Sequence, residues 1–146
     1  MSINDWPKHV QDQIRKQDEK RKRGGTFTEH QTLWIGKLPP GLNGDDGLIN
    51  MHWTEYAKVK KKWVQYIFAL QPKKHAGYVR VKYTRVSVSV MDWDNLGASF
   101  KVIGDALIEN DVIEDDSPKV IKKFEIFWKK AVSYRDQGVK IEIESI

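Results

Sequence analysis

The sequence has no cysteine among its 146 residues, which excludes disulfides and metal sites built on thiolates. It also lacks any apolar run near the roughly 20 residues that a membrane-spanning helix needs. Its first residues do not follow the basic-then-apolar order of a signal peptide. The four histidines are scattered, without the spacing of zinc ligands. We therefore expect a soluble, cytoplasmic protein with no membrane segment.

The chain does contain many apolar residues and an excess of positive charge. Apolar residues make up 40% of the sequence and include six tryptophans, enough for one domain with a real core. The formal net charge is +5, which favours an anionic partner only weakly. Neither a phosphate-binding glycine loop nor a nucleophile elbow is present.

Residues 5–23 have the composition of a polar helix. Asp5 suits its N-cap and Pro7 its first turn, and Gly24-Gly25 ends it. Two interpretations stay open: a solvated tail, or an arm that contacts DNA phosphates. The residues that would make those contacts are Lys20, Arg21, Lys22 and Arg23. We expect residues 1–30 to form a basic helical extension and residues 31–146 a single domain.

Periodicity predicts a mixed α+β fold in the rest of the chain. The expected elements are a strand at 32–38, a helix at 54–70, a strand at 78–90, a helix at 96–108, then two strands in "KFEIFWKKAV" and "VKIEIES". The last strand alternates, with Val139, Ile141 and Ile143 facing inward. We expect the last two strands to pair as a hairpin in a mixed sheet with helices packed on it.

The expected helix at 54–70 has two contrasting faces, and Thr54 is a plausible N-cap. One face carries apolar side chains: Tyr56, Val59, Trp63, Ile67 and Leu70. The opposite face carries Lys58, Lys61 and Lys62. These lysines are either a solvated surface or contacts to DNA phosphates, and the sequence supports both interpretations equally.

Acidic residues concentrate between Met91 and Ile121, which hold eight carboxylates and two lysines. If the preceding strand stays extended to residue 94, Asp92 and Asp94 continue the face of Val86, Val88 and Val90. Two adjacent carboxylates repel each other, and a hard cation such as Mg²⁺ or Mn²⁺ relieves that repulsion.

Simpler interpretations of the acids also stand. An Asp-Asn pair before a helix is a common N-cap, and "EDDS" at 114–117 is typical of a solvated turn. A calcium loop starting at Asp92 fails, because Leu96 and Ile103 occupy ligand positions. Whether Asp115 and Asp116 return to the same sheet edge as Asp92 depends on the strand direction, which the sequence leaves open.

Three motifs together are more specific than each alone. "DWDN", then "KVIGDAL", then "VIEDDSPKVI" resemble the RusA family of Holliday junction resolvases, with an upstream "LPPGLN" that is similar to the end of the family's first strand. The resemblance covers residues 33–146. The matching residues are Asp92, Asp94, Asn95, Lys101, Asp105, Ala106, Leu107, Asp115 and Asp116. In the family pattern the lysine follows the Asn by three positions, whereas Lys101 follows Asn95 by six, as if one helical turn were inserted.

The resemblance implies a cytoplasmic endonuclease, encoded by a bacterium or a phage, that acts in DNA recombination and repair. It would be a homodimer that resolves four-way DNA junctions by paired symmetric nicks, with Mg²⁺ or Mn²⁺ as cofactor. Asp92, Asp94 and Asp116 would be catalytic metal ligands with Asp115 beside them, and Lys101 would contact the phosphate or leaving group.

Two-fold symmetry fits a junction with two opposed strands to cut. Trp34 and Trp128 are candidates for the interface between the two copies. Two other functions remain open: a catalytically inactive protein of the same fold that binds branched DNA, and a nuclease that cuts flaps or replication forks.

Overall fold

The computed structural model describes residue 8, residues 30–43 and residues 47–146. The predicted helix at 5–23, including Lys20 to Arg23, lies outside the described residues except for Lys8. The elements are β1 (His30–Ile35), η2 (Leu48–Asn50), α2 (Trp53–Ala69), β2 (Val79–Ser87), α3 (Trp93–Glu109), β3 (Ile121–Lys130), η3 (Tyr134–Asp136) and β4 (Gly138–Ser145).

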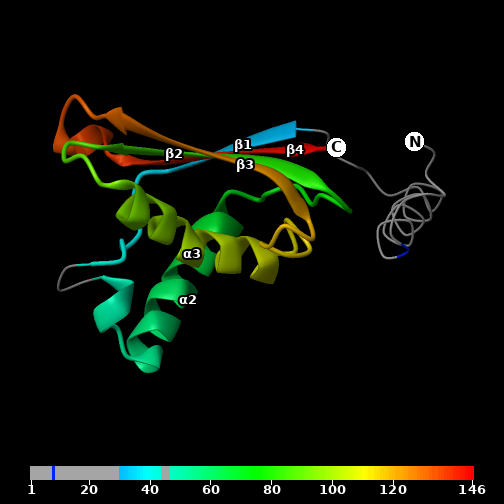
Figure 1. The fold of residues 1–146 in the computed structure, drawn as a ribbon, viewed down its shortest axis with the longest axis horizontal. Helices are drawn as coiled ribbons and strands as arrows, with labels where there is room; N and C mark the ends of the chain where they lie inside the picture. The colour runs from blue at the N-terminus through cyan, green and yellow to red at the C-terminus, as the bar shows by residue number, and fades with distance from the viewer. Residues whose placement is uncertain (1–7, 9–29, 44–46) are drawn as a thin grey trace.

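The four strands form one mixed sheet in the order β1-β4-β2-β3. β4 is antiparallel to both of its neighbours, and β2 and β3 are parallel. The parallel pair is joined through α3, because parallel neighbours need a long crossover connection. Figure 1 shows α2 and α3 on the same side of the sheet. The predicted α+β class is therefore confirmed.

The expected hairpin between the last two strands is wrong. β4 lies between β1 and β2, and β3 is an edge strand on the far side of β2. The alternation of β4 indicates which side chains face inward but carries no information about its neighbours. Burial separates the two strands: Val139, Ile141 and Ile143 of β4 are completely buried, as predicted, whereas most of β3 is exposed or partly exposed.

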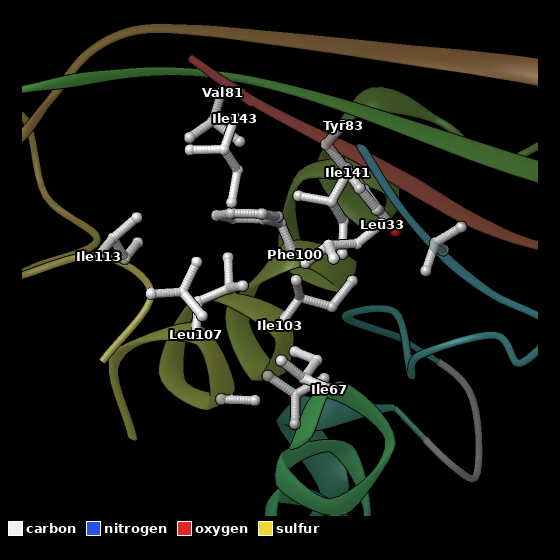
Figure 2. Packing of buried hydrophobic residues seen from close by; sticks show 14 of the residues in the cluster. Leu33, Ile67, Val81, Tyr83, Phe100, Ile103, Leu107, Ile113, Ile141 and Ile143 are labelled. Atoms are coloured by element: carbon white, nitrogen blue, oxygen red, sulfur yellow. The ribbon is translucent and has the colours of Figure 1, made fainter. Parts of the chain in front are cut away.

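The core fills the space between the sheet and α3. Figure 2 shows Phe100, Ile103 and Leu107 of α3 facing the inward side chains of the strands, with Ile67 of α2 below them. Burial of each such side chain stabilises the fold by roughly 1.5–3 kcal/mol. This packing fixes one face of α3, and α2 packs against another part of the same helix.

α2 has most of the predicted contrast between faces, but Leu70, predicted on the apolar face, is exposed. Trp63 and Ile67 are buried, while the three residues of the lysine face, Lys58, Lys61 and Lys62, are exposed. Thr54 is not the N-cap: the ring of His52 accepts a hydrogen bond from the Thr54 N–H, 3.3 Å, and the helix begins one residue earlier. In the described part of the chain, no helix combines the length and apolar character needed to cross a membrane.

β2 differs from its prediction in two ways. It ends at Ser87 instead of Val90, and its inward face carries the odd-numbered residues, including Val81 and Tyr83. Arg85 and Ser87 are therefore buried, and Val90 is 70% exposed. The strand ends before the acidic motif and Asp92 is already the cap of α3, so the expectation that a strand aligns Asp92 with Asp94 is wrong.

The inward face of β2 carries a buried arginine where the sequence pattern predicted valines. The Arg85 guanidinium points into the core side and donates from Nη1 to the carbonyl oxygen of Pro39, 2.8 Å. This bond ties the loop after β1 to the sheet. The Nε of Arg85 has no hydrogen-bond partner among the described residues. A charged side chain on the inward face is the reverse of what alternation predicts, because that signal follows hydrophobicity alone.

Candidate active site around helix α3

The acidic motif "DWDN" begins α3. Asp92 is the N-cap, and its carboxylate accepts hydrogen bonds from the N–H of Asn95 at 2.9 Å and from the Asn95 side chain at 3.1 Å. Asp94 lies exposed in the first turn, where the helix dipole favours a negative charge. Asp92 therefore has the N-cap role that the sequence offers as an alternative to metal binding.

Asn95 joins two motifs that are far apart in the sequence. Its side-chain oxygen accepts from the backbone N–H groups of Leu42 at 3.0 Å and Asn43 at 2.9 Å. Gly41 makes this close approach possible, since a β-carbon there would lie 2.6 Å from Met91 and 3.2 Å from the Asn95 oxygen. The segment "LPPGLN" therefore lies against the start of α3.

A second polar cluster lies further along α3. Asp105 accepts hydrogen bonds from the Tyr56 hydroxyl of α2 and from the Lys101 ammonium at 3.0 Å. Asp116 lies against the same stretch of helix: a β-carbon added at Gly104 would be 2.9 Å from an Asp116 carboxylate oxygen. The glycine in "KVIGDAL" thus makes room for Asp116. We call Tyr56, Lys101, Asp105 and Asp116 the α3 cluster.

Charges within the α3 cluster affect one another. Burial is the main reason that the pKa of Asp116 is raised, and the negative charges of Asp105 and Asp115 add to it. The positive charge of Lys101 acts in the opposite direction. Burial and the bond to Asp105 likewise raise the pKa of the Tyr56 hydroxyl. Lys101 thus acts electrostatically on Asp116 despite the apparent insertion before it.

Asp115 has a local partner. Its carboxylate accepts from Ser117 Oγ at 2.5 Å and from the N–H of Asp116 at 2.9 Å. The bond to Ser117 is the main reason that the pKa of Asp115 is lowered. These contacts fit the turn interpretation of "EDDS". Beside this turn lies a hollow of about 190 Å³, lined by Asp116, Pro118 and the rings of Phe100 and Phe124.

The predicted ligand set does not converge on one point in this structure. Asp94, Lys101 and Asp105 share one face of α3 because they are spaced i, i+7, i+11. At 1.5 Å per residue, Asp94 is roughly 15 Å along the axis from Gly104, against which Asp116 lies. Oxygens that share a Mg²⁺ ion each lie about 2.1 Å from it. Among the described residues, no three histidine, aspartate or glutamate side chains form a group that could hold a metal.

The donor chemistry therefore fits a hard cation only in part. Asp116, with Asp105 nearby, supplies carboxylates whose mutual repulsion a divalent cation would remove. Asp92 and Asp94 do not join them in this arrangement.

Sequence reasoning missed the polar contact of Tyr56. The helical spacing places Tyr56 on the apolar face of α2, although the hydroxyl of a partly buried tyrosine usually needs a partner. Asp105 was recognisable as an i+4 partner of Lys101, and that pair is present. The lysine face of α2 is exposed as predicted, and no described contact tests whether it binds DNA.

Neither a protein-family model nor a curated protein matches this chain.

Proposed function

We propose that the chain is a structure-selective endodeoxyribonuclease similar to the RusA family, acting on branched DNA with Mg²⁺. The observation that carries the proposal is the α3 cluster, in which a lysine, two aspartates and a tyrosine from three segments meet. The contact between "LPPGLN" and "DWDN" supports it, because two motifs of the resemblance become one local structure.

Phosphodiester hydrolysis needs positive charge near the phosphate and a group that activates the attacking water. Lys101 is 56% exposed at its side chain, so its ammonium is accessible to a phosphate while Asp105 holds it. Tyr56 donates to the same carboxylate and thereby fixes the position of Asp105. We assign Lys101 to contact with the phosphate and Asp116 to binding of the cation and its water. Asp105 positions Lys101, and Tyr56 positions Asp105.

Mg²⁺, when bound, would activate water and neutralise charge that develops on the phosphate. Asp116 is the residue that we expect to hold it. Asp92 and Asp94, at the start of the same helix face, are the further carboxylates that the resemblance assigns to the metal.

The rival function is binding of branched DNA without cleavage. The roughly 15 Å along α3 between Asp94 and the position of Asp116 favours this rival, because it leaves the predicted ligand set apart. The two functions make different demands on Mg²⁺: cleavage requires it, whereas binding through lysines and arginines depends on salt.

Labelled four-way junctions, flaps, forks and linear duplex, each incubated with purified protein in Mg²⁺ or in chelator, test the proposal. We expect Mg²⁺-dependent cuts in branched substrates and none in linear duplex. Symmetric paired nicks in the junction indicate resolution, and cuts confined to flaps or forks indicate the other nuclease class. Tight junction binding without cuts in Mg²⁺ or Mn²⁺ would establish the rival. A protein with Asp116→Asn, purified in parallel, controls for contaminating nucleases.

A further inference from the structure

The sheet face opposite the helices carries a row of side chains across all four strands. The register aligns Trp34 of β1 with Lys140 of β4, Lys140 with Thr84 of β2, and Thr84 with Phe127 of β3. The rings at the two ends of this row are nearly half exposed, 46% for Trp34 and 45% for Phe127. Within the described part of the chain, α3 packs on the other face, and α2 lies on that same side (Figure 1).

The ring of Trp34 packs on a glycine of β4. A β-carbon added at Gly138 would lie 2.6 Å from Cζ2 and 2.9 Å from Cη2 of the indole, so only glycine leaves room for the ring there. The indole therefore lies over the backbone of β4 with part of its surface open to solvent. A ligand that stacks on a ring already held in position loses less conformational entropy on binding.

A hollow of about 330 Å³ opens beside this indole. Val86 and Val132 supply apolar lining, and Lys129, Lys130 and Lys140 supply positive charge. Asp136 is the acid among the lining residues, and it already accepts a hydrogen bond from Ser133 at 3.0 Å. Lys140 has only a long contact of 3.9 Å to Glu142. The charge of this hollow complements an anion.

We propose that this face binds single-stranded DNA, with an unstacked base on Trp34 and the adjacent phosphates at Lys129 and Lys140. Stacking on aromatic rings combined with lysines along the backbone is the general chemistry of single-strand binding. A paired duplex cannot offer a base face to the indole, because its bases are stacked inside. The choice of DNA over RNA rests on the proposed function.

We call the face of Trp34, Lys129 and Lys140 the single-strand surface. The α3 cluster lies on the opposite side of the sheet. Binding at this surface thus adds a preference for substrates that carry a single-stranded arm, such as forks and flaps. The main rival occupant is a second copy of the chain, for which Trp34 was a candidate from the sequence.

Fluorescence anisotropy of labelled oligothymidylate, about 12 nucleotides long, tests the inference within the usual range of single-strand sites. We expect Trp34→Ala to weaken binding about fivefold or more and Trp34→Phe to retain most of it, since one stacked base contributes about that much. Because Trp34→Ala removes packing on Gly138, a charge variant is needed as well. Lys129→Ala with Lys140→Ala should lower the salt slope by roughly 0.7 per lost contact.

Lys123→Ala with Arg80→Ala is the matched control, because these two register partners lie on the same sheet face near the start of β2 and β3, away from the row of Trp34. Equal loss in this control, or Trp34→Ala and the charge variant both within twofold of wild type, would overturn the inference. Tighter binding of oligouridylate than of oligothymidylate would overturn the choice of DNA. A wild-type dimer that Trp34→Ala converts to a monomer in light scattering would assign the face to a second copy instead. Failure of the proposed nuclease leaves these binding measurements unaffected, because none of them depends on cleavage.

Discussion

The two ends of α3 carry the same kinds of residue in different surroundings. At its start, Asp92 and Asp94 are exposed and Asp92 serves as the N-cap. Near its other end, Asp105 and Asp116 are partly buried and act on each other and on Lys101. The first pair has water to solvate its charge, whereas the second depends on its neighbours. Partial burial beside specific charge partners is the commoner signature of a reactive site.

The largest expected effect is at Asp116. Asp116→Asn keeps the size and removes the charge, so we expect cleavage of a branched substrate to fall about a thousandfold, as loss of a main catalytic group does. Single-turnover rates at saturating protein measure it. Asp111→Asn is the matched control, because Asp111 is exposed just beyond α3 and pairs only loosely with Lys74 at 3.7 Å. Equal rates for the two variants would remove the α3 cluster from catalysis.

Lys101→Ala should lower turnover about a hundredfold, or on the order of 3 kcal/mol, if its charge acts on the transition state. Binding should change little, because one phosphate contact among many is a small share. If Lys101 only pairs with Asp105, the change is about 0.2–0.5 kcal/mol of stability with no effect on rate. A rate within about threefold of wild type would favour that structural role and direct attention to Lys119 or Lys122.

Asp92→Asn tests whether the start of α3 contributes more than a cap. Asparagine caps helices as well as aspartate does, so we expect the melting temperature to stay constant. Cleavage should nevertheless fall about tenfold, or 1.4 kcal/mol, if the charge is used in the reaction. Asp94→Asn should behave in the same way. Unchanged cleavage in both would leave the two ends of α3 with separate roles, one structural and one chemical.

Tyr56→Phe removes a single hydroxyl from the α3 cluster. Loss of its hydrogen bond to Asp105 should cost about 1 kcal/mol of unfolding free energy, measured by urea titration. The cleavage rate should drop only a few fold, because Tyr56 positions Asp105 and does not itself touch the phosphate. Tyr66→Phe on the same helix is the control. A larger rate loss than that of Lys101→Ala would mean that Tyr56 takes part directly.

We expect acid pH to act on the fold through His75, and this effect must be separated from effects on the α3 cluster. His75 is buried, and burial lowers its pKa, with His30 adding to the shift. Gln31 donates to Nε2 of His75 at 2.8 Å, because an amide nitrogen cannot accept, so the neutral ring is required there. A lowered pKa in the folded state means that stability present above about pH 6.5 is lost as pH falls.

We therefore expect the melting temperature to decrease between pH 7.5 and 5.5, and His75→Gln to reduce that dependence. Thermal unfolding followed by circular dichroism measures both. If the dependence is unchanged in the variant, His75 is not its source, and an acid loss of cleavage would need another explanation.

The elements themselves were largely predictable, because they follow from spacing along the chain. The periodicity of α2 identified Trp63 and Ile67 as core residues, and the alternation of β4 identified its three buried side chains. Helix and strand boundaries shifted by a few residues, as at His52 and Ser87, because local capping and pairing decide them. The inward position of Arg85 was not predictable, since its partner is a carbonyl 46 residues away.

By itself, the sequence determined an α+β chain without thiol chemistry, rich in tryptophan, with acids gathered in a basic protein. Only the tertiary structure decided that β4 lies between β1 and β2, that Tyr56 meets Asp105, and that Asp116 lies against Gly104. The physical reason is range. Propensity, capping and periodicity act over a few residues, whereas strand order and the meeting of side chains from α2, α3 and the following turn depend on how the whole core packs.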